Sequence, residues 1–115
     1  MNIRKIAGLI ALVVLPVGTA LAAPQNMLGF DDMSCAAWNK SKGDADQRTA
    51  YINWIRGFLS GHNYALPSQQ VATISSGTIE NKIDQYCRET PAGLFSEGAM
   101  RLSDQFSGRN QPIRK

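Results

Sequence analysis

Residues 51–66 read YINWIRGFLSGHNYAL, and their apolar side chains recur with the period of an α-helix. One face of this helix would carry six residues spaced by three or four: Tyr51, Trp54, Ile55, Phe58, Leu59 and His62. Asp44 or Asp46 can cap its start, because a carboxylate accepts hydrogen bonds from the free amides of a first turn. Gly57 and Gly61 lie beside this face and cost roughly 1 kcal/mol each in helix propensity, so we expect another helix to pack closely against them.

Shorter helical patterns flank this long helix. Residues 33–38 (MSCAAW) predict one or two helical turns that present Cys35 and Trp38 to the core. A second amphipathic helix is expected after the break at residues 66–68, and its apolar face holds Ile79, Ile83, Tyr86 and Cys87. Residues 71–74 (VATI) form the segment for which a strand is the alternative.

A last helix is predicted to start at Thr90-Pro91, with threonine as N-cap and proline in the first helical position. Gly108 would end it. Its cleanest apolar stripe is formed by Phe95, Ala99, Leu102 and Phe106. The fold class expected from these patterns is all-α, a small single-domain bundle of three or four helices.

The first 22 residues have the pattern of an export signal. A short basic start precedes an uncharged apolar run (residues 6–15), which is followed by helix breakers and the small residues TALA. A membrane anchor is the alternative, but this run is shorter than the roughly 18–20 apolar residues that cross a bilayer. We expect cleavage after Ala22, with Ala23 as the competing position, and hence a periplasmic protein with no membrane span after signal cleavage.

The 93 residues from Ala23 to Lys115 suffice for one small domain. We divide them into a flexible N-terminus (23–32), a helical domain (33–107) and a polar basic tail (108–115). Export places Cys35 and Cys87 in an oxidising compartment, where we expect them to form a disulfide. Closing a loop of about 53 residues would stabilise the fold by roughly 4 kcal/mol on the chain-entropy model.

Composition argues against several classes of function. The exported chain has ten Lys and Arg against nine Asp and Glu, a net charge of about +1, and no clustered basic stripe for nucleic acid. Two thiols and one imidazole are too few for a four-ligand zinc site. No serine lies in a GxSxG pattern, and the acids are interpreted as solvated charges rather than a glycosidase pair. We therefore expect neither a cofactor nor enzymatic activity.

No Asp, Glu, Lys or Arg occurs from Gly57 to Ile79. This uncharged stretch is either a buried helix end with a covered loop, or an apolar surface for a homodimer or another protein partner. The residues expected at such a surface are Trp54, Phe58, Leu59, His62, Tyr64 and Leu66. His62 itself is interpreted as a helix-end residue favoured by the helix dipole, with a pH-sensitive contact as the alternative and catalysis as the least favoured role.

Together, Ser34-Cys35, the aromatic segment WIRGF (54–58) and the segment IDQYCRETP (83–91) resemble the HdeA/HdeB family of small periplasmic acid-stress chaperones. The resemblance covers roughly residues 33–106. It implies a single disulfide between Cys35 and Cys87. It also implies a protein that is dimeric at neutral pH, loosens in acid and holds unfolded clients through apolar surface. Family members carry charged residues in the middle loop, whereas residues 63–79 have none.

A second resemblance leads to a different function. The segment 51–63 followed by the helix after Pro91 is similar to the Tai-like periplasmic immunity proteins, which inhibit secreted amidase effectors. The uncharged stretch would then be the inhibitory surface. An accessory protein of a secretion or conjugation apparatus is a third alternative. The function expected first is an HdeA-like holdase.

Overall fold

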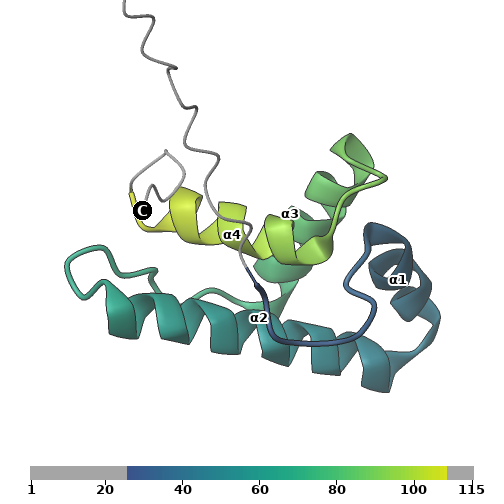
Figure 1. Ribbon diagram of the computed structural model, residues 1–115, viewed down its shortest axis with the longest axis horizontal. Coiled ribbons are helices and arrows are strands. Elements are labelled where there is room, and N and C mark those ends of the chain that lie inside the picture. Colours follow the sequence, from purple (N-terminus) through teal and green to yellow (C-terminus); the bar gives the residue numbers. More distant parts are fainter. Residues whose placement is uncertain (1–25, 109–115) are drawn as a thin grey trace, which may run out of the picture.

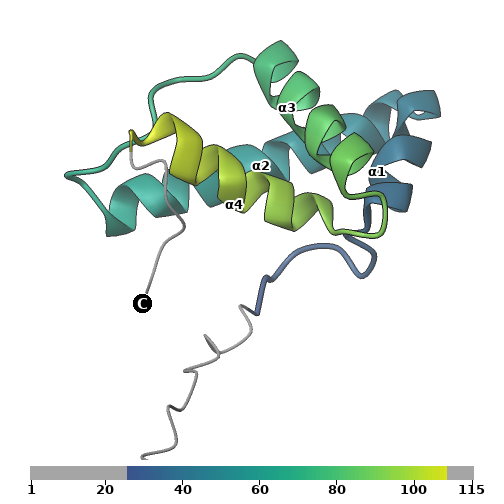
Figure 2. The same cartoon turned by 90° about the horizontal axis from the view of Figure 1, so that it is seen from above.

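The computed structural model describes residues 26–108, and its regular elements are helical. They are α1 (Cys35–Lys40), the short 3₁₀-helix η1 (Ser41–Gly43), α2 (Ala45–Ala65), α3 (Ser76–Glu89) and α4 (Phe95–Phe106). The long α2 runs the length of the domain, with α4 and α3 packed on one side of it and α1 at the end where α2 begins (Figure 1). The view from above shows α3 beside α4 (Figure 2).

The predicted all-α fold, stapled by one disulfide, is confirmed. Residues 71–74, for which a strand was the alternative, belong to no regular element. The expected signal peptide and the tail after Gly108 lie outside the described residues. No helix within residues 26–108 has the length and apolar character that a bilayer crossing requires.

The start and the buried face of α2 follow the sequence pattern. Asp44 is the N-cap, and its carboxylate accepts a hydrogen bond from the backbone N–H of Gln47 at 3.2 Å. The buried face repeats every three or four residues, and it consists of Arg48, Tyr51, Ile52, Ile55, Leu59 and His62. The apolar pattern predicted neither Arg48 nor Ile52 on this face, and the predicted Trp54 and Phe58 are only half-buried.

The centre of the core is aromatic. The ring of Phe95 on α4 lies 4.7 Å from that of Tyr51 on α2 and 5.8 Å from that of Trp38 on α1, measured between centroids. Trp38 and Phe95 are fully buried. The disulfide joins Cys35 on α1 to Cys87 on α3, with 5.3 Å between the Cα atoms. Every helix of the domain is thus tied to this centre by a large side chain or by a covalent bond.

The predicted start of α4 is wrong. Thr90 is the C-cap of α3, where its N–H donates to the carbonyl of Tyr86 at 2.8 Å, and α4 begins only at Phe95. The residues in between pair with the segment before α1. The N–H of Cys35 donates to the carbonyl of Gly93, and the N–H of Phe95 donates to the carbonyl of Met33. Leu94, which forms the bridge to Ser34, is held extended (φ −109°, ψ 137°), so no helix can run through it, and Pro91 lies in a turn before it. The end of α4 agrees with prediction, since Gly108 follows with a φ of 78°.

The predicted close packing at Gly57 and Gly61 is also wrong. Both glycines are exposed, and a Cβ placed on either one would meet no atom within 4 Å. The close approach of two helices occurs at Gly98 on α4. A Cβ there would lie 2.9 Å from Cδ1 of Ile83 and 3.1 Å from Cδ1 of Tyr86, both on α3. Gly98 therefore permits the α3–α4 contact.

The segment before α1, for which we expect flexibility, makes two contacts with α2. The carbonyl of Leu28 accepts a hydrogen bond from Trp54 Nε1 at 2.8 Å. The ring of Phe30 lies edge-on against Tyr51, with 4.8 Å between centroids. Residues 28–30 are thereby fixed to α2, although they form no helix or strand.

Candidate functional site

The six residues expected to form one apolar surface do not do so. Leu59 and His62 are buried, with 7% of each residue exposed. Trp54 and Phe58 are half-buried and stack on each other with 5.9 Å between centroids. Tyr64 alone among the six is fully open, at 91% exposed, and Leu66 is half-buried. The helical rotation of α2 divides these residues between the core, the edge and the solvent side.

The uncharged stretch instead forms a helix end and a loop that covers it. Residues 66–75, here named the covering loop, turn back beside the C-terminal half of α2 (Figure 1). Val71 and Ile74 of this loop are buried, at 6% and 8% exposed. They join Leu59 and Ile79 in the hydrophobic core. Val71 and Ile74 therefore belong to the core and not to an exposed apolar surface.

Two polar side chains of α2 hold the covering loop. His62, in the last turn of α2 as predicted, donates from Nε2 to the carbonyl of Gln69 at 2.9 Å. Asn63 binds Val71 twice: its Nδ2 donates to the carbonyl at 3.0 Å, and its Oδ1 accepts from the N–H at 2.7 Å. All of these partners are amide, carbonyl or imidazole groups, so the loop is attached without an ion pair.

A groove lies between α2 and the covering loop. Four α2 residues line one wall because they share a helical face: Arg56, Leu59, Ser60 and Asn63. Residues 71–74 and Ile79 complete the lining, and the groove has a volume of about 230 Å³. Arg56 donates from Nη2 to Oγ of Ser76 at 2.9 Å. No carboxylate among residues 26–108 lies within ion-pair distance of Arg56.

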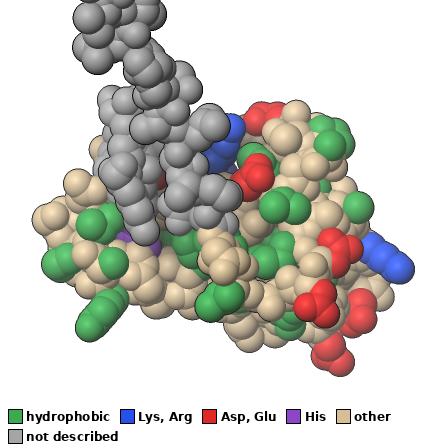
Figure 3. All heavy atoms as spheres, in the orientation of Figure 1, with side chains coloured by type: hydrophobic (Ala, Val, Ile, Leu, Met, Phe, Trp, Pro, Cys, Tyr) green, Lys and Arg blue, Asp and Glu red, His purple; other side chains and the backbone are tan. Residues whose placement is uncertain are grey.

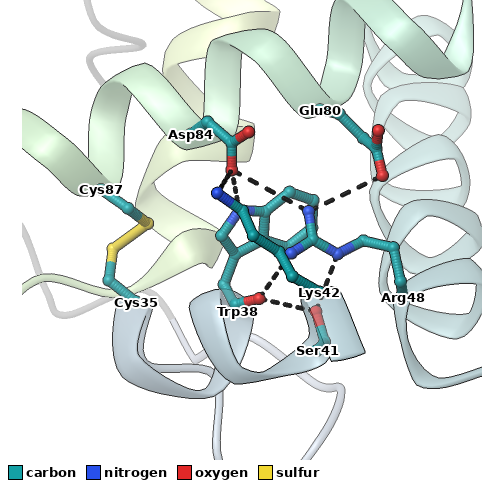
Figure 4. Close-up of polar contacts among 8 residues, drawn as sticks. All are labelled: Cys35, Trp38, Ser41, Lys42, Arg48, Glu80, Asp84 and Cys87. Carbon is teal, nitrogen blue, oxygen red and sulfur yellow. Dashed lines mark hydrogen bonds and ion pairs between the residues drawn. A yellow bond between two sulfur atoms is a disulfide. The ribbon is translucent and has the colours of Figure 1, made fainter. Parts of the chain in front are cut away.

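The other polar centre of the molecule surrounds Arg48 (Figure 4). The guanidinium of Arg48 lies 3.8 Å above the ring of Trp38, and it donates to the carbonyl of Trp38 at 2.7 Å and to Oγ of Ser41 at 2.8 Å. Its Nη1 is 3.7 Å from Oε1 of Glu80 and 3.9 Å from Oδ1 of Asp84. Asp84 also accepts from Trp38 Nε1 at 2.8 Å.

This Arg48 cluster joins α1, η1, α2 and α3 one helical turn away from the disulfide. Trp38 follows Cys35 by three residues, and Asp84 precedes Cys87 by three, so the Trp38–Asp84 hydrogen bond and the disulfide form neighbouring links between α1 and α3 (Figure 4). Sequence reasoning missed the cluster. The sequence feature that indicates burial of Arg48 is its position seven residues before Ile55, which places both residues on the same helical face.

A third polar contact links α3 to α4. The hydroxyl of Tyr86 donates to Oε2 of Glu97, and the guanidinium carbon of Arg101 lies 5.4 Å from the centroid of the Tyr86 ring. Burial, the hydrogen bond to Glu97 and the charge of Glu97 together raise the pKa of Tyr86 to about 12. Tyr86 is therefore neutral at physiological pH and acts here as a hydrogen-bond donor.

Charge is unevenly distributed over the surface. In the view of Figure 3, acidic side chains gather toward the end of the molecule where α1 lies, whereas the end formed by the C-terminal turns of α2 and the covering loop shows apolar and neutral polar side chains around His62. Within residues 26–108 no three His, Cys, Asp or Glu side chains come close enough to share a metal ion.

Comparison with protein families, with characterised proteins and with solved structures finds no match to this chain.

Proposed function

We propose that this protein is an exported periplasmic holdase of the acid-stress type, which binds unfolded clients through apolar surface. The observation that carries the proposal is the covering loop. Leu59, Val71, Ile74 and Ile79 are buried beneath or within a segment that has no charged residue and is attached to α2 by neutral hydrogen bonds. Opening this one segment would expose a contiguous apolar patch, which is the kind of surface that binds unfolded chains.

Acid supplies a driving force for opening. Protonation of the nine carboxylates changes the net charge of the chain after Ala22 from about +1 to about +10, or about +11 with His62, and self-repulsion of that size loosens a small core. The pKa of Asp32, just before α1, is lowered because the hydroxyl and the N–H of Ser34 donate to its carboxylate. A lowered carboxyl pKa adds stability above its ordinary range, and this stability is lost as the pH falls.

The disulfide would keep such opening local. It ties α1 to α3, whereas the covering loop lies between α2 and α3 and has no covalent attachment to either helix apart from the chain itself. The loop can therefore separate from α2 while α1, α3 and their shared core stay together.

The test is suppression of client aggregation by the purified mature protein. We expect suppression at about pH 2–3, where carboxyl groups are protonated, and none at pH 7. Val71→Lys places a charge within the apolar patch that the closed loop buries, and it should abolish suppression of client aggregation. Thr73→Lys adds the same charge at an exposed position two residues away and should leave it intact. Absence of suppression at both pH values contradicts the proposal.

Location is tested separately. The protein should be recovered from the periplasmic fraction with Ala23 as its first residue. Recovery from the cytosol with the leader attached would contradict export and remove the setting in which an acid-stress role makes sense.

A constitutive protein-binding module, such as an immunity or apparatus protein, is the second proposal. It is favoured by Tyr64, a large aromatic residue that is 91% exposed in the folded protein at the end of α2. Aromatic residues of this kind are common anchors at protein interfaces. A neighbouring effector gene would identify the partner to purify, and Tyr64→Glu should weaken its binding at pH 7. Equal binding by Tyr64→Glu and the wild type would contradict this role for Tyr64.

A further inference from the structure

We propose that the groove between α2 and residues 71–74 is a binding site for an extended, acidic segment of a partner protein. The groove is present while the covering loop is closed, so this inference concerns the folded protein at neutral pH and does not rest on opening in acid.

The charge of Arg56 lacks a counterion within the described part of the chain. Arg48, eight residues earlier on the same helix, is buried against two carboxylates. Arg56 contacts only the hydroxyl of Ser76 through its side chain. Ser76 is the first residue of the 14-residue helix α3, whose first turn contains no acidic residue. The guanidinium of Arg56, which lines the groove, thus lies beside the positive end of this helix dipole, and a carboxylate bound to Arg56 would interact favourably with both.

The facing wall provides unpaired peptide groups. Ala72 and Thr73 are exposed, and neither forms a hydrogen bond in the part of the chain from 26 to 108. Val71, by contrast, has both its N–H and its carbonyl bound by Asn63. An exposed segment with free N–H and carbonyl groups is suited to pair with another extended backbone, as in recognition by strand addition. The ligand that matches this wall is a polypeptide.

The groove is small, and its apolar lining residues offer little accessible surface. Leu59, Val71, Ile74 and Ile79 all line it and are themselves at most 8% exposed. Its volume of about 230 Å³ is below the roughly 300–1,000 Å³ of sites that hold cofactors or drug-sized ligands. The fitting ligand is therefore an extended segment that places an Asp or Glu side chain beside Arg56.

The experiment measures binding of labelled heptapeptides to the mature protein at pH 7 by fluorescence anisotropy. One peptide carries a single Asp flanked by Val residues, and its matched versions carry Asn or Lys in place of Asp. All have amidated C-termini, so that the side-chain carboxylate is the anionic group in the first peptide. We expect the Asp peptide to bind and the Lys peptide not to bind, with weaker binding as salt is raised.

Two substitutions locate the site. Arg56→Gln should weaken binding of the Asp peptide at least about tenfold, since hydrogen bonds to charged groups contribute roughly 1.5–3 kcal/mol. Arg88→Gln removes an equal charge at an exposed position outside the groove and should leave binding unchanged. Ser60→Trp, at an exposed position on the rim, should fill the groove and abolish binding while circular dichroism shows an intact helical fold.

The amide NMR signals of Ala72 and Thr73 should shift when the Asp peptide is added. Equal binding of the Asp and Lys peptides, an Arg56→Gln variant with wild-type affinity, or shifts that fall elsewhere would overturn the proposal. Client suppression in acid is a separate measurement, so the holdase proposal can fail while this one stands, and the reverse.

Discussion

Arg48 shows how a charged side chain can lie on the core face of a helix. Its guanidinium lies over the ring of Trp38, two of its N–H groups donate to neutral oxygen atoms, and two carboxylates face it from α3. Burial of a charge is tolerated when its hydrogen bonds and counter-charges are both supplied. Arginine fits this position because its planar guanidinium can stack on an aromatic ring and donate hydrogen bonds in several directions at the same time.

Arg48→Lys should therefore destabilise the protein although the charge is kept. A lysine cannot stack on Trp38 and bind Ser41 and the Trp38 carbonyl together, so we expect the free energy of unfolding to fall by about 1–3 kcal/mol. Urea denaturation measures this change. Arg88→Lys, at an exposed position, is the control and should stay within about 0.5 kcal/mol of the wild type. An unchanged urea midpoint for Arg48→Lys would show that the Arg48 cluster contributes little.

Tyr86 gives a prediction in alkali. Its pKa is raised from 10.0 to about 12 in the folded protein, so the folded state favours the protonated phenol. The stability from this preference is complete below the unfolded pKa and is lost as the pH rises through the folded one. Ultraviolet titration of tyrosinate should show one group ionising near pH 12, and Tyr86→Phe should remove that transition. Three ordinary transitions in the folded wild type would contradict the assignment.

At the scale of elements, the glycines of α2 and α4 have different effects. Gly57 and Gly61 only lower the helix propensity of α2, whereas Gly98 allows α3 and α4 to pack closely. Gly57 and Gly61 lie on the open side of α2, so an alanine there meets nothing and should stabilise the protein by about 0.5–1 kcal/mol at each site. Gly98→Ala would press on Ile83 and Tyr86 across the α3–α4 contact. We expect it to destabilise by about 1–3 kcal/mol, the usual effect of overpacking. Thermal unfolding of the three variants tests this, and a stabilising Gly98→Ala would contradict the packing described here.

For the whole molecule, the disulfide closes a loop in which the two cysteines are separated by 52 residues. On the chain-entropy model a loop of this length is worth roughly 4 kcal/mol, a large share of the about 5–15 kcal/mol that stabilises a typical small domain. The Cys35→Ala/Cys87→Ala double variant should lose about 2–5 kcal/mol in urea denaturation at pH 7. Because the Arg48 cluster also joins α1 to α3, we expect its helicity at pH 7 without denaturant to persist. Loss of helicity under those conditions would show that the disulfide alone holds the two helices together.

The sequence by itself determined the helical class, the buried face of α3, four of the six buried residues of α2, a carboxylate cap at the start of α2, the end of α4 at Gly108 and the pairing of Cys35 with Cys87. These features depend on residue spacing and on local chemistry, which can be recognised from residues close together in the sequence. Tertiary structure alone decided four others: the late start of α4, the close approach at Gly98, the burial of Arg48 and the groove beside Arg56. Each arises where segments far apart in sequence meet, as when residues 33–35 pair with 93–95, and no local pattern records which partner will be there.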